Sequence, residues 1–60
     1  MAGEAIFIVE DEGVTAMVLQ DSLEDMGYQV CGIAASGEEA IRKIAETKPN
    51  LVLMDISIQG

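Results

Sequence analysis

The sequence has few cations, a single cysteine and no long apolar run, and each scarcity excludes a class of protein. Only three of its 60 residues are Lys or Arg, against eleven acids, so its formal net charge is −8. An acidic chain repels phosphate backbones and anionic lipid, so direct binding to nucleic acid or to a membrane surface is not expected. Cys31 has no second cysteine for an internal disulfide and is expected to behave as a small buried hydrophobe. No apolar run approaches the roughly 20 residues that span a bilayer.

The length and the apolar content together indicate one small packed domain. A chain of 60 residues forms one domain at most, and a chain this short hides only about 60% of its unfolded surface. Half of the residues are apolar, which is too many for a disordered chain. The first residues carry Glu4 instead of the basic segment that opens a secretory signal, so a cytoplasmic location is expected.

Three short segments have the pattern of buried strands. Residues 5–9 and 51–54 are unbroken apolar runs, which are typical of strands covered on both faces in a parallel sheet. Residues 28–34 lie between these two runs in the sequence. They are predicted to form another strand, whose apolar part is Val30, Cys31, Ile33 and Ala34. Residues 56–60 are expected to begin a loop.

Two helices are expected between these strands. The first covers residues 14–26 and ends at Gly27, a typical residue just past a helix end. Its apolar stripe consists of Ala16, Leu19, Leu23 and Met26. The second begins at Ser36, which stands three residues before Glu39 as in a capping box, and stops at Pro49. Its buried face is expected to consist of Ala40, Ile41, Ile44 and Ala45. The order β-α-β-α-β predicts an α/β fold with parallel strands and right-handed crossovers.

Acidic residues follow two of the predicted strands directly. Glu10 and Asp11 follow the first strand, and Asp55 follows the third. Ligand sites in such sheets form beyond the carboxyl ends of the strands, and three carboxylates gathered there repel one another unless a cation lies among them. Mg²⁺, with its preference for oxygen ligands, fits such a site. The alternative is that these acids only aid solubility and helix capping, which is the preferred interpretation for Glu12 at the start of the first helix.

Five motifs occur in order along the chain and resemble one known family. They are IFIVEDE at residues 6–12, LEDMGYQV at 23–30, ASGEEAI at 35–41, KPNLV at 48–52 and LVLMDI at 51–56. This set resembles the receiver domains of two-component response regulators. The resemblance implies a flavodoxin-like, doubly wound parallel sheet with strand order 2-1-3-4-5. Residues 1–60 would supply its N-terminal half, with strand order 2-1-3, as a truncated receiver domain.

The resemblance also implies a role for each acid. Asp55 would accept a phosphoryl group from the phosphohistidine of a histidine kinase. Asp11 would bind Mg²⁺ directly, Glu10 would assist through water, and Ser57 would offer its backbone carbonyl to the metal. The module would be a signal receiver and not an enzyme. The switch Ser or Thr of the family and its phosphate-binding Lys would lie beyond Gly60, so weak Mg²⁺ binding and poor phosphorylation are expected.

Other functions remain open at this point. A haloacid-dehalogenase-like phosphatase would need a second acid where Ser57 stands, and a Rossmann unit would need a glycine-rich loop after the first strand. The stronger alternative is a self-associating half-domain with a structural role and no phosphotransfer. The exposed third strand predicts a homodimer, formed by antiparallel pairing of two third strands. Val14, Met17 and Val18 lie off the main stripe of the first helix. They could be scattered apolar residues of the surface, but an interface is the preferred interpretation.

Overall fold

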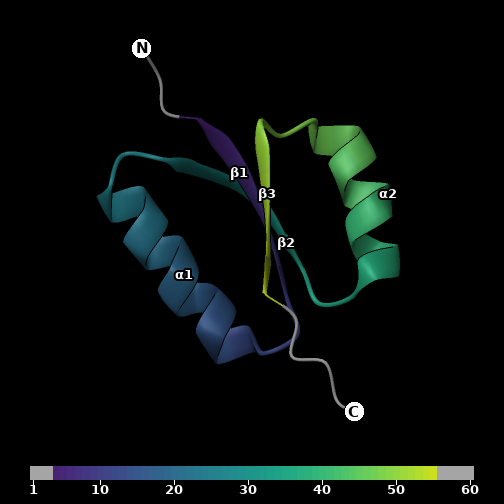
Figure 1. Cartoon of the computed structure of the whole chain (residues 1–60), viewed down its shortest axis with the longest axis horizontal. Helices are drawn as coiled ribbons and strands as arrows, with labels where there is room; N and C mark the ends of the chain where they lie inside the picture. The colour runs from purple at the N-terminus through teal and green to yellow at the C-terminus, as the bar shows by residue number, and fades with distance from the viewer. Residues whose placement is uncertain (1–3, 56–60) are drawn as a thin grey trace.

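The computed structural model describes residues 4–55, with Asp55 described in its backbone only. The elements follow in the order β1 (Ala5–Glu10), α1 (Gly13–Asp25), β2 (Gln29–Ala34), α2 (Gly37–Thr47) and β3 (Leu51–Asp55). The strands form one parallel sheet in the order β2-β1-β3, and the two helices flank it on opposite sides (Figure 1). The predicted α/β class, the element order and the strand order 2-1-3 are confirmed. The loop expected at residues 56–60 lies outside the described residues.

The central strand β1 is the most deeply buried segment. All of its residues from Ile6 to Glu10 are buried, because β1 has a strand on each side and a helix over each face. Phe7 and Val9 form a core cluster with Ala34 of β2 and Ala40 of α2. Ile6 and Ile8 alternate with them and point to the opposite face. Because both faces of β1 are buried, residues 5–9 are all apolar and do not alternate with polar residues.

A glycine in β2 makes room for the largest core side chain. A Cβ atom at Gly32 would lie 2.6 Å from Cε2 of Phe7, which is closer than real contacts allow. The pairing of β1 with β2 also shifts by one residue between Ile6 and Phe7, so that Cys31 has no partner in the register. Gly32 and this bulge together let the ring of Phe7 lie against the backbone of β2.

The end of α1 agrees with the predicted glycine stop. Gly27 has φ +97°, a left-handed conformation that favours glycine. The N–H of Tyr28 donates a hydrogen bond to the carbonyl oxygen of Leu23 at 3.0 Å. Two details of the prediction were wrong. Met26 is exposed and not part of the buried stripe, because it lies past the last helical turn, and β2 begins at Gln29 instead of Tyr28.

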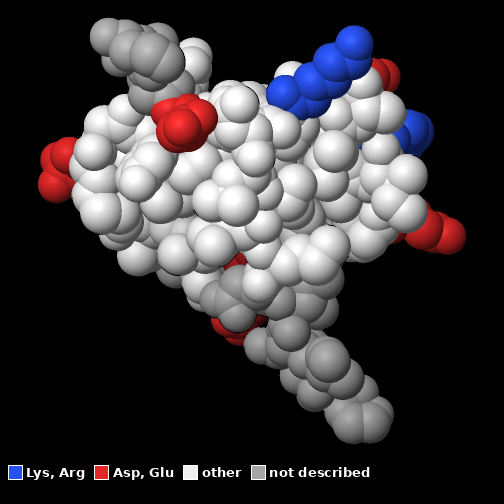
Figure 2. Space-filling model, turned by 45° about the horizontal axis from the view of Figure 1, so that its top comes forward, with Lys and Arg blue, Asp and Glu red and all other residues white. Residues whose placement is uncertain are grey.

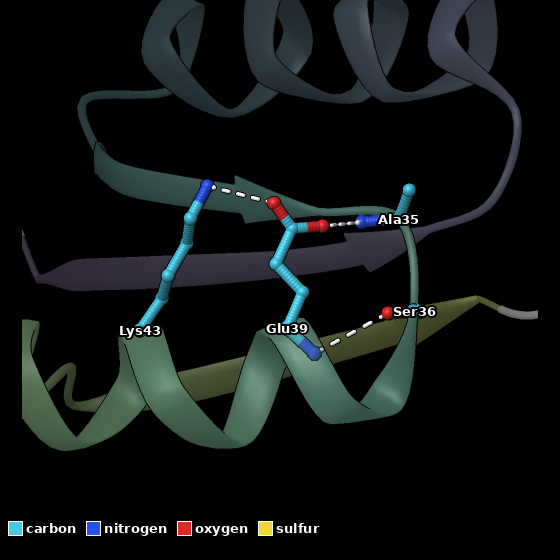
Figure 3. Close-up of polar contacts among 4 residues, drawn as sticks. All are labelled: Ala35, Ser36, Glu39 and Lys43. Atoms are coloured by element: carbon cyan, nitrogen blue, oxygen red, sulfur yellow. Dashed lines mark hydrogen bonds and ion pairs between the residues drawn. The ribbon is translucent and has the colours of Figure 1, made fainter.

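Two hydrogen bonds between backbone N–H groups and side chains cap the start of α2 (Figure 3). Ser36 Oγ accepts a bond from the backbone N–H of Glu39 at 3.3 Å, and Glu39 Oε1 accepts one from the N–H of Ala35 at 3.0 Å. The other carboxylate oxygen of Glu39 lies 3.0 Å from Nζ of Lys43. The Ser36 half of the predicted capping box is therefore confirmed, whereas the reciprocal bond of Glu39 comes from the N–H of Ala35 and not from that of Ser36. The Ala35 amide and the Lys43 ammonium hold the pKa of Glu39 below its ordinary value.

This pKa shift predicts a pH-dependent contribution to stability. A carboxylate whose pKa is lowered by folding stabilises the native state above its unfolded pKa, and the contribution disappears as the pH falls through the folded pKa. Glu39→Gln should therefore be less stable than the parent at neutral pH, with the gap closing in acid below the ordinary glutamate range. Urea midpoints at several pH values measure this gap. Glu38→Gln removes the same charge from the same helical turn, and an equal gap for that control would contradict the assignment.

The prediction for the buried face of α2 was partly wrong. Ala40 is buried and Ile44 packs against the core cluster, as expected. Ile41, however, is 74% exposed, and Ala45 is exposed as well, because only the Ala40 side of the helix meets the sheet. On α1, Val14, Met17 and Val18 are all exposed, and the interface expected there stays a prediction.

The three cations all belong to the α2 segment. Arg42 and Lys43 lie on the helix, and Lys48 is its C-cap residue, with φ 51°. Figure 2 shows the basic side chains gathered over one side of the molecule, whereas acids are scattered more widely. Within residues 4–55, no helix has the length and apolar character needed to cross a membrane.

Candidate functional site

The carboxyl ends of β1 and β3 meet at one edge of the sheet. β1 ends at Glu10 and β3 ends at Asp55, and these two residues are partners in the parallel register. Neighbouring strands are about 4.8 Å apart. The structure therefore places the backbone of Asp55 directly beside Glu10, at the edge where ligands of open α/β sheets bind.

Glu10 is held in a fixed position. It is only 3% exposed, and it is the only charged residue among those described that is buried. Its Oε2 accepts a hydrogen bond from the backbone N–H of Glu12 at 3.0 Å. This bond turns the carboxylate back toward the β1–α1 connection, so that the acid lies beside the start of the next helix.

Asp11 and Glu12 form the connection between β1 and α1. Asp11 is exposed and is the first residue after the strand, so its carboxylate is accessible to water and ions. Glu12 is the N-cap residue of α1, where a negative charge is favourable. Its Oε1 accepts a hydrogen bond from the hydroxyl of Thr15 at 3.2 Å. Glu12 makes no side-chain capping hydrogen bond to the helix backbone, so its position agrees only with a favourable charge at the helix N-terminus.

The donor atoms at this edge are those that Mg²⁺ prefers. Glu10 and Asp11 offer only oxygen ligands, one of them buried and one open to solvent, and Mg²⁺ binds proteins through one or two carboxylates while it keeps several waters. The residues present therefore fit a magnesium ion in chemistry. Among the side chains that the structure describes, no three acidic, His or Cys groups converge on one point. The side chain of Asp55 and all of Ser57 lie outside that description, so their roles remain predictions.

Asn50 sets the register that brings Asp55 beside Glu10. Its backbone N–H donates to the carbonyl of Ala5 at 2.8 Å, and its Oδ1 accepts from the N–H of Ala5 at 2.9 Å. These two bonds attach the start of β3 to the start of β1, at the opposite end of the strands from the acids. From the sequence alone, Asn50 is only a turn residue between the second helix and the third strand. Its place between Pro49 and an apolar run was the available signal.

A three-stranded parallel sheet with buried and exposed acids at the carboxyl edge defines a receiver-like α/β module. The chain belongs to the response regulator receiver domain family, whose model matches residues 6–60. It is similar to the chemotaxis protein CheY of Thermotoga maritima, with 41% identity over 56 residues, or 93% of this chain. It is also 38% identical over 53 residues, or 88% of the chain, to the transcriptional regulatory protein PdtaR of Mycobacterium tuberculosis.

A further relative is the alkaline phosphatase synthesis transcriptional regulatory protein PhoP of Bacillus subtilis, which is 40% identical over 53 residues, or 88% of this chain. The chain spans less than half the length of these relatives, matching 47% of CheY, 26% of PdtaR and 22% of PhoP. Membership of the receiver family places the chain among the modules of two-component signalling.

Proposed function

We propose that this chain is a phosphoacceptor module in which Asp55 receives a phosphoryl group from the phosphohistidine of a histidine kinase. The observation that carries the proposal is the register of β1 and β3, which sets Asp55 beside Glu10 at the carboxyl edge of the sheet. The family match, which includes residue 55, supports it. The module acts on no separate substrate, so it is a signal receiver and not an enzyme.

The transfer is a displacement at phosphorus. A carboxylate oxygen of Asp55 forms a new O–P bond while the N–P bond of the phosphohistidine breaks, and the bonding electron pair leaves with the imidazole nitrogen. In this proposal the carboxylates of Glu10, Asp11 and Asp55 lie close together. Their negative charge and that of the incoming phosphoryl group must be balanced by a cation. Asp11 would hold Mg²⁺ directly, Glu10 would orient a metal-bound water, and the carbonyl of Ser57 would complete the set. When bound, Mg²⁺ supplies the positive charge that this acidic edge lacks.

The distribution of cations makes the transfer slow in these 60 residues alone. All three cations fall between residues 42 and 48. Lys48 immediately precedes the Pro49–Asn50 connection into β3, so it belongs to the end of the sheet opposite Asp55. Without a cation from the protein at the acidic edge, the developing charge is balanced by the metal alone. We propose that residues 1–60 are the first half of a receiver domain, which the 47% coverage of CheY supports.

The alternative function is structural. The five residues of β3 have β1 on one side and no second neighbour among the described strands, and an exposed apolar edge is a template for pairing. We infer a homodimer formed through β3, which would exist with or without phosphotransfer. The net charge of −8 argues against nucleic acid as a direct partner. The cytoplasmic location expected from the sequence remains a prediction.

Magnesium binding by Asp11 predicts a thermal shift. A ligand that binds only the folded chain stabilises it by about 1.4 kcal/mol when its free concentration is about ten times its dissociation constant. Titration of Mg²⁺ should therefore raise the melting temperature of the parent chain, whereas Asp11→Asn should lose most of the rise. Asp21→Asn removes the same charge from an exposed position on α1 and should keep the rise. Equal shifts in all three chains would rule out a metal site at Asp11.

A further inference from the structure

The strand that carries Asp55 has an apolar pattern that does not fix its own register. Residues 51–54 are all apolar, so β3 offers apolar side chains to both faces of the sheet. A one-residue slip against β1 exchanges the two faces of a strand. In β3 such a slip would replace apolar side chains by other apolar side chains on either face, so the hydrophobic pattern opposes it only weakly. The register of β3 therefore depends on other contacts.

A slip of β3 would displace the acceptor residue. In the observed register, Glu10 pairs with Asp55. If β3 moved by one residue toward the start of β1, Asp55 would pair with Val9, about 3.3 Å back from the edge of the sheet and on the opposite face. The same slip only lengthens the connection from α2 by one residue, which costs little loop-closure entropy. This competing register would remove Asp55 from the candidate site.

The two hydrogen bonds of Asn50 distinguish the observed register from this slipped one. The backbone N–H of Asn50 donates to the carbonyl oxygen of Ala5 at 2.8 Å, and its Oδ1 accepts from the N–H of Ala5 at 2.9 Å. After the slip, Leu51 would stand opposite Ala5. Leucine supplies a backbone N–H but has no side-chain acceptor, so the N–H of Ala5 would lose its partner. The side chain of Asn50 is therefore the group that this slip would leave without its contact.

Pro49 opposes a slip in the other direction. In that register Pro49 would stand opposite Ala5, and proline has no backbone N–H to donate to the Ala5 carbonyl. Its side chain has no acceptor for the N–H of Ala5 either. Pro49 and Asn50 together thus favour a single register, at the end of the sheet where the chain leaves α2 and enters β3 (Figure 1).

We propose that Asn50 is a positioning residue for phosphoryl transfer, whose side chain selects the register that brings Asp55 beside Glu10. The inference rests on the proposed role of Asp55 as the acceptor. Asn50 lies at the opposite end of β3 from the acids, so it acts through the strand and not by contact with the reacting groups. The pairing of β3 with β1 is unbroken from Leu51 to Asp55, and a register fixed at its first residue is therefore fixed at its last.

Nuclear Overhauser contacts between backbone protons report the register without any reference to phosphate. In the parent chain, Phe7 should show contacts to its register partner Val52. Asn50→Ala removes the side-chain acceptor and keeps the backbone N–H, so a second set of signals should appear in which Phe7 contacts Leu53. With both registers populated about equally, labelling of Asp55 by acetyl phosphate and Mg²⁺ should fall about twofold.

Two further variants separate positioning from a general loss of stability. Asn50→Asp keeps a side-chain oxygen at the same place and should restore the single register and the parental labelling rate. Its new carboxyl should also shift the amide signal of Ala5 as it titrates, which reports the bond even if Asn50→Ala does not fold. Thr47→Val removes a different side-chain hydrogen bond beside the same connection, from Thr47 Oγ1 to the carbonyl of Lys43 at 2.9 Å. It should lower stability without producing a second register.

The outcomes score this inference apart from the acceptor role. A single parental register in Asn50→Ala, with the contact between Phe7 and Val52 intact, would overturn it. A second register in Thr47→Val would do the same, as would an Ala5 amide that does not respond to the new carboxyl of Asn50→Asp. If the backbone contacts change as expected but no chain is labelled at Asp55, the acceptor proposal fails while the role of Asn50 in the register stands.

Discussion

Phe7→Ala is expected to unfold the chain. Phe7 is 0% exposed and is the largest side chain of the core cluster that joins β1, β2 and α2. Truncation of a buried Phe to Ala costs about 3–5 kcal/mol. Small domains have total stabilities near the low end of about 5–15 kcal/mol, and a chain of 60 residues has little surface to bury. Far-ultraviolet circular dichroism and a urea titration measure the loss.

An exposed residue and a neighbouring glycine provide the controls. Ile41→Ala removes an apolar side chain that is largely exposed, so its effect should stay within about 0.5 kcal/mol. Gly32→Ala should destabilise the chain because its new methyl group meets the ring of Phe7. Combining Gly32→Ala with Phe7→Leu should cost less than the sum of the two single changes, since a smaller side chain relieves the overlap. If Phe7→Ala costs no more than Ile41→Ala, the core is not where the structure places it.

Asp55→Asn is expected to abolish phosphoryl acceptance while the fold survives. An amide lacks the anionic oxygen that attacks phosphorus, so no acyl phosphate can form. Removing one acid from an edge that also holds Glu10 and Asp11 should leave stability unchanged or slightly raised, because like charges repel. The measurement is incorporation of phosphate from acetyl phosphate with Mg²⁺, followed by mass spectrometry of the intact chain. Circular dichroism of the same samples records the fold.

A matched acid elsewhere makes this result specific. Asp25→Asn changes an exposed acid at the end of α1 and should leave labelling at the parental rate. Sedimentation should also show that Asp55→Asn associates as the parent does, because the β3 contact is independent of the transfer. Labelling of Asp55→Asn at the parental rate would exclude Asp55 as the acceptor. The structural alternative predicts no labelling of either chain.

The fold was predictable where local patterns and tertiary packing agree. The apolar run of β1 reports burial on both faces, and Gly27 and the Ser36–Glu39 pair mark helix ends through local hydrogen bonds. Local patterns failed where burial depends on distant neighbours. Ile41 matches a buried helical stripe, but none of the described elements covers it, and Met26 continues a stripe beyond the last turn.

The candidate site was predictable in its location but not in its details. Parallel strands bring their carboxyl ends to one edge, which is enough to place Glu10 near Asp55 from the sequence. The deep burial of Glu10 and its bond to the Glu12 amide depend on the turn between β1 and α1, which no spacing rule describes. The two hydrogen bonds between Asn50 and Ala5 likewise join positions 45 residues apart, so the periodicity of the sequence does not predict them.

Mapping the phosphoryl group tests the central claim most directly. The chain is treated with acetyl phosphate and Mg²⁺, the acyl phosphate is trapped by reduction with borohydride, and the modified residue is located by peptide mass spectrometry. The account predicts slow, magnesium-dependent modification at Asp55 and at no other acid. Modification at Glu10 or Asp11 instead, or modification at Asp55 that is equally fast without Mg²⁺, would contradict it.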